Sequence, residues 1–296
     1  MLTVVERPAP DVLISIPPAT RAVVSWNADA AAGEIALIAH HADGSVSCPL
    51  PYVRWSPQER RSLDGADVTT RIAIDVLHSE APLAGIEVEA TVALDAVAVA
   101  TPPPPDVCAP ARRSVAPLDV PQLSQYLREH PGRRGWCSAA ALAMLLRFHG
   151  RDADVASVAR EVFDSAYDGT GNWTFNAAYA GARGLRGIVA YLSGIDRVAA
   201  FVAAGFPVAI SISWQAGQLP GAPLDVSDGH LIVVYGIEPA EVLVNDPAQP
   251  AVAVRYPRAA LDALFRAHGG VAYLVAPRTR TAELVALANG VAAVAS

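Results

Sequence analysis

The sequence contains no lysine, so all 22 of its positively charged residues are arginine. This absence excludes a lysine nucleophile, a Schiff base and a Ser–Lys dyad from any chemistry the chain performs. The formal net charge is −7, and no basic stripe interleaved with aromatic residues is present. Nucleic acid is therefore not an expected partner.

Cysteine is scarce. The three cysteines, Cys48, Cys108 and Cys137, are odd in number and widely separated along the chain. They match neither a CxxC metal-ligand pattern nor a disulfide framework. We therefore expect no bound metal and no organic cofactor, and no scaffold of disulfides.

Long apolar runs are also missing. No segment approaches the roughly 20 apolar residues that a membrane-spanning helix needs. The first residues carry Glu6, Arg7 and several prolines where a signal peptide requires a continuous apolar core. The sequence thus predicts a soluble, cytoplasmic protein, or a secreted one if a signal was removed upstream. It gives no indication of oligomeric state.

The sequence pattern changes sharply near residue 100, from β-rich to mixed helical and strand segments. Before it, short runs such as GEIALIAH and GIEVEATVAL cluster β-branched residues between turn signals, which predicts an all-β, sandwich-like domain of two sheets. Four consecutive prolines then favour a stiff extended connector. The predicted organisation is an accessory β-domain (1–100), a Pro-rich linker (101–116), a second domain (117–279) and a C-terminal tail or helix (280–296).

The second domain is predicted to be α+β. The segment CSAAALAMLLRFHG is rich in strong helix formers and ends at Gly150. Further helical windows and a series of apolar strands follow, which is typical of an α+β fold. The helical windows are 151–164, 172–183 and 195–205, and the strands are 207–214, 230–237, 241–247 and 271–277.

Cys137 is placed unusually for a structural cysteine, because it stands in the first turn of the apolar helix rather than inside it. The partial positive charge at a helix N-terminus stabilises a thiolate over a thiol. A cysteine nucleophile needs a base, and histidine suits that role because its pKa lies near neutral pH. His149 is excluded, since 12 residues of helix separate it from Cys137 by roughly 18 Å.

His230 is the histidine we select, because it begins a buried apolar strand directly after a glycine. A short turn leads into a second strand that ends in Asn245 and Asp246. If the two strands form an antiparallel hairpin, the end of the second lies beside the start of the first. Asp246 or Asn245 would then orient His230. The Cys137 amide and a glutamine side chain, Gln125 or Gln122, are candidate oxyanion donors, with Gln125 preferred.

Several motifs in order resemble the C39-like cysteine peptidases, a branch of the papain-like fold. They are PQLSQY, GWCSAAALAMLL, GNWTFNAAYAG, GFPVAISI, DGHLIVVYGI and VLVNDPA, and they cover about residues 117–277. The β-rich region before them looks like the N-terminal domain of some bacterial members. The resemblance, with the arginine-only composition, fits a bacterium with a GC-rich genome.

The resemblance implies a thiol protease with a catalytic triad of Cys137, His230 and Asp246, Gln125 as oxyanion donor, and a peptide or protein substrate. Trp136, Trp173 and Asn176 are candidate groove-lining residues, although Trp173 and Asn176 have a plainer interpretation in helix capping and packing. Ser138 stands where the bacteriocin-processing members have glycine, and those members are fused to a transporter, whereas we expect no membrane segment in this sequence. Removal of double-glycine leader peptides is therefore not carried over.

Two other functions remain open on the sequence alone. The same thiol site could transfer its acyl group to an amine, which would make the protein an acyltransferase or cyclase. Alternatively, the chain could be a non-catalytic peptide-binding protein that keeps a papain-like groove. The sequence indicates no particular natural substrate.

Overall fold

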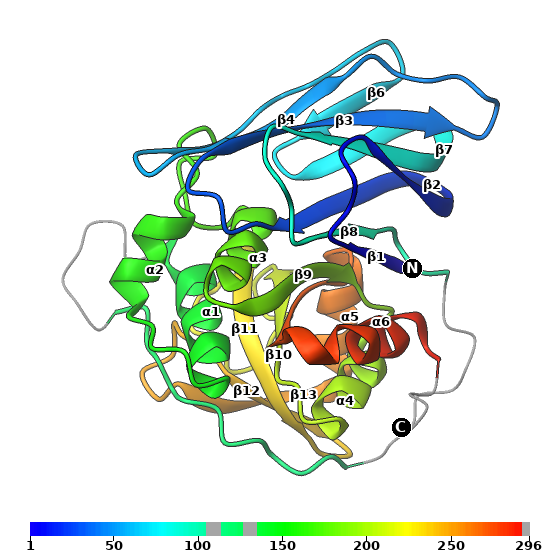
Figure 1. Ribbon diagram of the computed structural model, residues 1–296. Coiled ribbons are helices and arrows are strands. Elements are labelled where there is room, and N and C mark those ends of the chain that lie inside the picture. The colour runs from blue at the N-terminus through cyan, green and yellow to red at the C-terminus, as the bar shows by residue number, and fades with distance from the viewer. Residues whose placement is uncertain (105–113, 127–134, 292–296) are drawn as a thin grey trace.

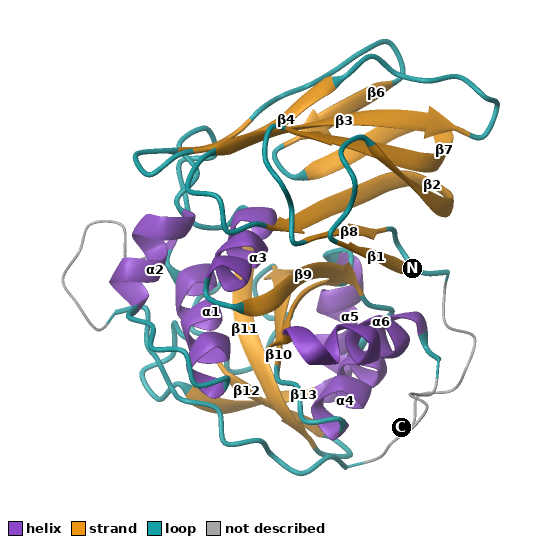
Figure 2. Cartoon of the chain, in the orientation of Figure 1, coloured by secondary structure: helices purple, strands orange, loops and turns teal. Residues whose placement is uncertain are grey.

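The structure is a computed structural model that describes residues 1–104, 114–126 and 135–291 of the chain. It contains two antiparallel β-sheets, and the fold is mixed α+β. Residues 1–100 form the first sheet. The second sheet and the helices follow it in sequence and lie beneath it in Figure 1. Figure 2 shows that the first sheet carries no helix on its outer side, whereas the second is packed among helices.

Eight strands make up the N-terminal sheet. Its order is β1-β8-β2-β7-β3-β4-β5, and β6 also pairs with β7. Buried and less buried residues alternate along the β3 segment, as expected for a strand with one face in a core. The strands are β1 (Leu2–Glu6), β2 (Val12–Asn27), β3 (Gly33–His41), β4 (Leu50–Trp55), β5 (Arg60–Ser62), β6 (Thr70–Ala73), β7 (Val76–Ala90) and β8 (Ala96–Ala100).

This sheet is continuous and folds over on itself, which corrects the prediction of two separate sheets. Tyr52 of β4 lies three strands from β2 in the sheet order, yet its hydroxyl donates a hydrogen bond to Val24 O of β2 at 2.9 Å. The ring of Trp26 also packs edge-on against Tyr52, with centroids 6.2 Å apart. The long strand β2 has register shifts between Ser15 and Arg21, and such irregularities bend a strand. One bent sheet thereby covers its own core.

The second sheet has six strands in the order β13-β12-β11-β10-β14-β9, all antiparallel. Its strands are β9 (Leu185–Tyr191), β10 (Val208–Trp214), β11 (Ser227–Ile237), β12 (Glu241–Asn245), β13 (Ala253–Pro257) and β14 (Val271–Pro277). The helices are α1 (Cys137–Phe148), α2 (Val155–Val162), α3 (Trp173–Ala182), α4 (Ile195–Ala203), α5 (Arg258–Ala267) and α6 (Thr281–Asn289), with a 3-10 turn η2 (Arg278–Arg280) before α6.

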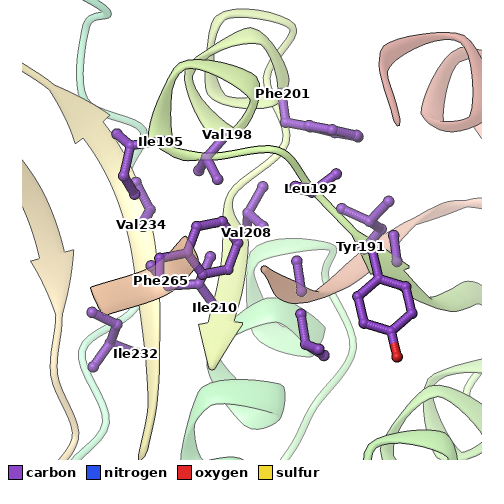
Figure 3. Packing of buried hydrophobic residues seen from close by; sticks show 14 of the residues in the cluster. Tyr191, Leu192, Ile195, Val198, Phe201, Val208, Ile210, Ile232, Val234 and Phe265 are labelled. Carbon is purple, nitrogen blue, oxygen red and sulfur yellow. The ribbon is translucent and has the colours of Figure 1, made fainter. Parts of the chain in front are cut away.

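Both faces of this sheet are buried. Because successive side chains of a strand point to opposite faces, alternate residues pack in two different cores. Val208 and Ile210 of β10 share a core with Phe265 of α5 and residues of α4 (Figure 3). Ala209, between them, points to the opposite face and packs in the core that holds α1 and α2. The sheet is therefore the middle layer of three.

The predicted helical windows contain α2, α3 and α4, and the four predicted strands correspond to β10, β11, β12 and β14. Among the helices and strands after residue 136, β9, β13 and α5 were not predicted from the sequence. The β9 segment is buried at every residue, so it lacks the alternation that marks a strand with one exposed face. The segment predicted as a tail or helix forms α6 over Thr281–Asn289.

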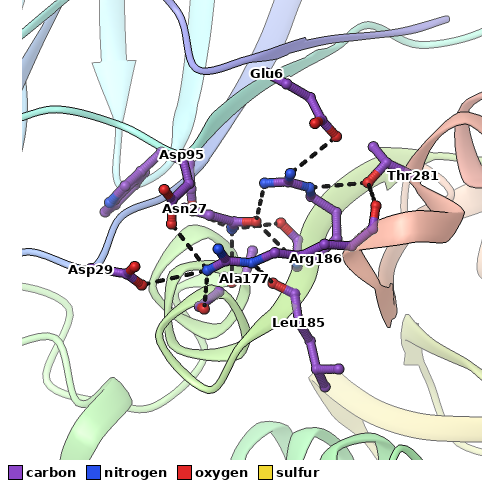
Figure 4. A network of polar contacts seen from close by, with 12 residues as sticks. Glu6, Asn27, Asp29, Asp95, Ala177, Leu185, Arg186 and Thr281 are labelled. Atoms are coloured by element: carbon purple, nitrogen blue, oxygen red, sulfur yellow. Dashed lines mark hydrogen bonds and ion pairs between the residues drawn. The ribbon is translucent and has the colours of Figure 1, made fainter.

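A buried polar cluster joins the two sheets (Figure 4). Asn27, at the end of β2, accepts hydrogen bonds at Oδ1 from the Gly187 amide (3.3 Å) and from Arg186 Nη1 (3.1 Å). The same guanidinium donates to Glu6 Oε1 at 3.0 Å and to Thr281 Oγ1 at 3.2 Å. Arg186 thus connects the N-terminal sheet, β9 and α6 in one network.

Part of the Pro-rich linker, residues 105–113, lies outside the described residues, and so does Cys108. At its end, Val115 exchanges two backbone hydrogen bonds with Ile237 of β11, at 2.8 and 3.1 Å. Among the described residues, no helix combines the length and apolarity required to cross a membrane.

Candidate active site

Cys137 is the first residue of α1, as the sequence predicted. Residues 138–146 of the helix are all buried, so α1 is packed on every side and its position is fixed. The Ser138 hydroxyl lies 2.9 Å from the hydroxyl of Tyr273 on β14, which anchors the first turn to the sheet. The thiol therefore stands at a rigid helix N-terminus, where the helix dipole favours negative charge.

His230 lies on β11 and Asp246 directly follows β12, and these two strands pair as the hairpin inferred from the sequence. β11 and β12 are antiparallel, with Val233 opposite Asn245. His230 Nε2 lies 2.7 Å from Asp246 Oδ1, and both side chains are buried. Asn245 instead donates its side-chain amide to Val120 O at 3.2 Å. Of the two residues considered from the sequence, Asp246 is the one that contacts His230.

Two further side chains hold this pair in place. The Tyr256 hydroxyl donates to Asp246 Oδ2 at 2.6 Å, and the Ala248 amide donates to Asp246 Oδ1 at 2.9 Å. The ring of Trp214 packs edge-on against the His230 ring, with centroids 5.5 Å apart. His230 Nε2 faces Asp246, and the Cys137 thiol lies close enough to the same imidazole for a hydrogen bond between them to lower the pKa of the thiol and raise that of His230.

The electrostatics favour a charged Cys–His pair. Burial alone would raise the pKa of the Cys137 thiol, but the hydrogen bond and charge of His230 and the amides of Leu231 and Ser138 outweigh burial and lower it. Burial alone would lower the pKa of His230, yet its bonds to Asp246 and Cys137 raise it to about 10. The pKa of Asp246 stays below its ordinary value despite burial. Both shifts act in the direction of a thiolate beside an imidazolium.

Gln125 approaches the same site from the segment before α1. Its side chain is buried and lines the cavity that contains Cys137 and His230. Its backbone amide donates to Pro247 O at 3.0 Å, so this segment is attached to the loop that follows Asp246. Gln122, the alternative, is exposed. Residues 127–134, between Gln125 and α1, lie outside the described residues.

Cys137 and His230 line a cavity of about 590 Å³, within the roughly 300–1,000 Å³ typical of ligand pockets, whereas Asp246 lies behind His230 and is fully buried. Its wall includes residues from both sheets. The lining residues are Ala73, Ile74, Asp75, Val76, Gln125, Gly135, Cys137, Tyr167, Asp168, Gly169, Thr170, Gly171, Trp173, Ser211, Leu224, Ser227, Asp228, Gly229, His230, Leu231, Ala248 and His268.

Of the three predicted groove residues, only Trp173 is among those that line this cavity. Asn176 is fully buried, and its side-chain amide donates to Thr170 O (2.8 Å) and Asn172 O (2.7 Å), so it shapes the loop before α3. Trp136 is buried and packs in the core of α1 and α2. The groove-lining expectation is therefore wrong for Asn176 and Trp136, because local packing takes both side chains inward.

Several site residues were missed from the sequence. Tyr256 and Trp214 contact the predicted pair but lie on other strands, so only strand pairing brings them there. Ile74 and Asp75 line the cavity although they precede Cys137 by about 60 residues. No sequence motif marks these positions. Among the residues that the structure describes, no group of three or more His, Cys, Asp or Glu side chains is arranged to hold a metal ion.

Comparison with known proteins gives one family. The Peptidase_C39 like family matches residues 117–273, which is more than half of the chain. No curated protein matches the sequence.

Three solved structures are similar to part of the chain. A protein from Bacillus anthracis described as a C39-like peptidase is 18% identical, covers 56% of this chain and 98% of its own, and has a TM-score of 0.40. A double glycine motif protease from an AMS/PCAT transporter, solved in complex with the leader peptide, is 20% identical over 55% and 97%, with a TM-score of 0.39. The peptidase domain of Streptococcus ComA is 16% identical over 53% and 98%, also at 0.39.

Proposed function

The chain belongs to the Peptidase_C39 like family, and on that premise we propose that it is a cysteine peptidase with Cys137 as nucleophile, His230 as base and Asp246 as the group that orients the base. The observation that carries the proposal is the chain of contacts from the Cys137 thiol through His230 to Asp246, at the wall of an open cavity. The Peptidase_C39 like match also supports a papain-like arrangement for residues 117–279.

In the first half of the reaction, His230 holds the proton of the Cys137 thiol. The sulfur attacks the carbonyl carbon of the scissile peptide bond, and the carbonyl electron pair moves to the oxygen. The Cys137 backbone amide and the Gln125 side chain stabilise this oxyanion. As it collapses, the C–N bond breaks, His230 gives its proton to the leaving amine, and a thioester remains on Cys137.

In the second half, a water molecule attacks the thioester carbonyl. The neutral His230 removes a proton from this water, and the C–S bond breaks to release the carboxylic acid product. The proton on His230 restores the starting pair with Cys137. Asp246, held by Tyr256, keeps the imidazole oriented throughout and stabilises its charged form.

The proposed division of the chain follows the sequence prediction, with an accessory β-unit over residues 1–100, a linker over 101–116 and the peptidase unit over 117–279. The buried network around Asn27 and Arg186 supports a fixed arrangement of the two units. The β-unit contributes residues 73–76 to the cavity wall, which supports a role close to the substrate.

The pH dependence of Cys137 alkylation by iodoacetamide tests the proposed pair. It is measured with Cys48 and Cys108 replaced by serine, so that only one thiol reacts. We expect a midpoint well below the ordinary thiol value of about 8.5, because the imidazolium stabilises the thiolate. His230→Ala should return the midpoint to about 8.5. Tyr256→Phe should move it part of the way, since Asp246 loses a hydrogen bond.

His78→Ala serves as the matched control, because His78 is a half-buried histidine on β7 that does not line the cavity. It should leave the midpoint unchanged. If the wild-type midpoint lies near 8.5 and His230→Ala does not change it, the proposal is refuted and a non-catalytic binding protein is favoured.

Cleavage itself is measured by mass spectrometry of a peptide library, with Cys137→Ala as the blank. Adding a competing amine separates the two enzymatic possibilities. Free carboxylic acid products that persist with the amine present indicate hydrolysis. Products in which the amine captures the acyl group indicate an acyltransferase or cyclase.

A further inference from the structure

The N-terminal sheet reaches the cavity of Cys137 through one hairpin turn. β6 ends at Ala73 and β7 begins at Val76, and these two residues pair across the turn. The turn residues are Ile74 and Asp75, and all four consecutive residues line the cavity. The wall opposite the peptidase elements is thus supplied by the β-unit.

Two hydrogen bonds hold this turn against the peptidase unit and its own sheet. The Asp75 carboxylate is buried and accepts from the Trp173 amide at 2.7 Å, at the N-terminus of α3. The Asp75 carbonyl accepts from the Tyr52 hydroxyl at 2.9 Å. Because this hydrogen bond joins the turn to the first residue of α3, it fixes where the turn lies relative to the cavity.

Ile74 has a conformation that its residue type disfavours. Its φ is +60°, whereas Asp75 has no positive φ, which is the pattern of a two-residue hairpin turn that normally has glycine at its first position. A β-branched residue at positive φ is strained, and strain of this kind concentrates at functional sites. The side chain of Ile74 is nevertheless 36% exposed, so the core of its sheet does not require it.

A second exposed apolar side chain faces the same region. Tyr167 lines the same cavity as Cys137 and Asp75 and is 45% exposed. Burial chiefly raises the pKa of its hydroxyl, and the charges of Cys137, Asp75 and Asp164 raise it further. Its ring lies against Gly169 and Gly171, where an added Cβ would meet it at 3.0–3.1 Å.

We propose that Ile74 and Tyr167 form an apolar subsite, contributed jointly by the two units, for a large aliphatic or aromatic side chain beside the scissile bond of the peptide substrate. This inference rests on the proposed peptidase function and adds its substrate class. Asp75 is a positioning residue, since it acts by holding the turn. The described lining of the cavity contains no arginine that would instead select an acidic side chain.

Peptide chloromethyl ketones test the subsite directly. Cys137 sulfur displaces chloride from the methylene carbon, so an S–C bond forms, a C–Cl bond breaks and chloride leaves. Reagents that differ only in the side chain beside the reactive group, leucine or alanine, are compared in the background without Cys48 and Cys108. Rates are normalised to iodoacetamide, which carries no side chain.

We expect the wild type to react at least 10-fold faster with the leucine reagent than with the alanine reagent. Apolar pockets typically distinguish ligands that differ by a methylene group by about 10- to 200-fold in rate. Ile74→Gly should reduce that ratio about 10-fold. It should also raise Tm, because glycine releases the positive-φ strain. A loss of preference together with a rise in stability is not what a merely structural role produces. Ile74→Asn, which also tolerates positive φ, gives an independent second variant.

Val68→Gly is the matched control, because Val68 is a β-branched residue of the same unit, 94% exposed and outside the cavity lining. It should keep the wild-type ratio. Equal rates for leucine and alanine reagents in the wild type, or an unchanged ratio in Ile74→Gly, would overturn the subsite. These outcomes concern the preference between two alkylating reagents. Failure of the proposed function would be seen differently, as a Cys137 thiol with an ordinary pKa that does not depend on His230.

Discussion

At the scale of single residues, burial sets the behaviour of the charged groups in this protein. Asp246 keeps a pKa below its ordinary value because His230, Tyr256 and Ala248 all donate to it. Asp75 is buried with fewer donors, and burial raises its pKa from 3.8 to about 7 despite the Trp173 amide. The same residue type is thus ionised at one site and largely protonated below neutral pH at the other, according to the number of donors.

The Asp75 carboxyl should make stability depend on pH. Its folded-state pKa of about 7 exceeds the unfolded value of 3.8, so between these values the folded protein holds a proton that the unfolded chain has released. Its contribution is complete below about pH 4 and is lost as pH rises through 7. Asp75→Asn removes this dependence. Relative to that variant, the wild-type free energy of unfolding should fall by up to about 4 kcal/mol from pH 4 to pH 8.

The measurement is urea denaturation of both proteins at several pH values. A difference between them that is constant across pH would contradict the assigned pKa. A difference that grows in favour of the wild type toward pH 8 would mean that the ionised carboxylate is preferred at the α3 N-terminus.

At the scale of elements, α3 and β9 of the peptidase unit approach each other closely beside Asn27 of the β-unit. Gly187 on β9 allows this approach, because an added Cβ would lie 2.1 Å from the Ala177 carbonyl oxygen of α3. The Gly187 amide also donates to Asn27 of β2. One glycine therefore lets a helix, a strand of the second sheet and a strand of the first sheet share the same small volume.

Gly187→Ala should destabilise the protein by about 3 kcal/mol, since the new methyl group meets backbone rather than a flexible side chain. Gly229→Ala is the control, because no atom lies within 4 Å of a Cβ added there. It should change the free energy of unfolding by less than about 0.5 kcal/mol. Urea titration followed by circular dichroism gives the free energy of unfolding of both variants. If Gly187→Ala were as stable as Gly229→Ala, α3 would be able to move away from β9 without loss of stability.

At the scale of the whole molecule, the two sheets share a hydrophobic core and a buried polar network. Residues of the N-terminal sheet, including Val23 and Ala98, share a hydrophobic core with residues of β9, β10 and α4. Arg186 is 3% exposed and hydrogen-bonds to groups from β1, β2 and α6. Loss of this side chain would leave buried polar groups of both units without their donor.

Arg186→Ala should therefore destabilise both sheets together, by about 3 kcal/mol, as expected for a buried charged donor. Arg54→Ala should cost less than about 1 kcal/mol, because the Arg54–Glu34 pair is about half exposed on both sides. Hydrogen exchange read by mass spectrometry separates the two sheets. Faster exchange in Arg186→Ala confined to one sheet would mean that the units unfold independently.

Sequence patterns alone predicted the candidate site residues and the mixed α+β class of the fold. A thiol at the first turn of an apolar helix and a histidine and carboxylate on consecutive strands are local features, and strand period and a short turn suffice to bring His230 to Asp246. The helical windows and apolar strands likewise predicted most of the elements of the second unit, because their patterns are local.

Tertiary structure alone decided the surroundings of that site. Tyr256, Trp214 and Ile74 reach it from elements whose positions depend on strand order, and no local pattern encodes which strands become neighbours. The same holds for the β-unit, where the sequence predicted two sheets and bulges in one long strand instead bent a single sheet over its own core. The Asn176 side chain points inward because its amide donates hydrogen bonds to the loop before α3. The sequence alone does not show whether such a side chain bonds to its own loop or faces the cavity.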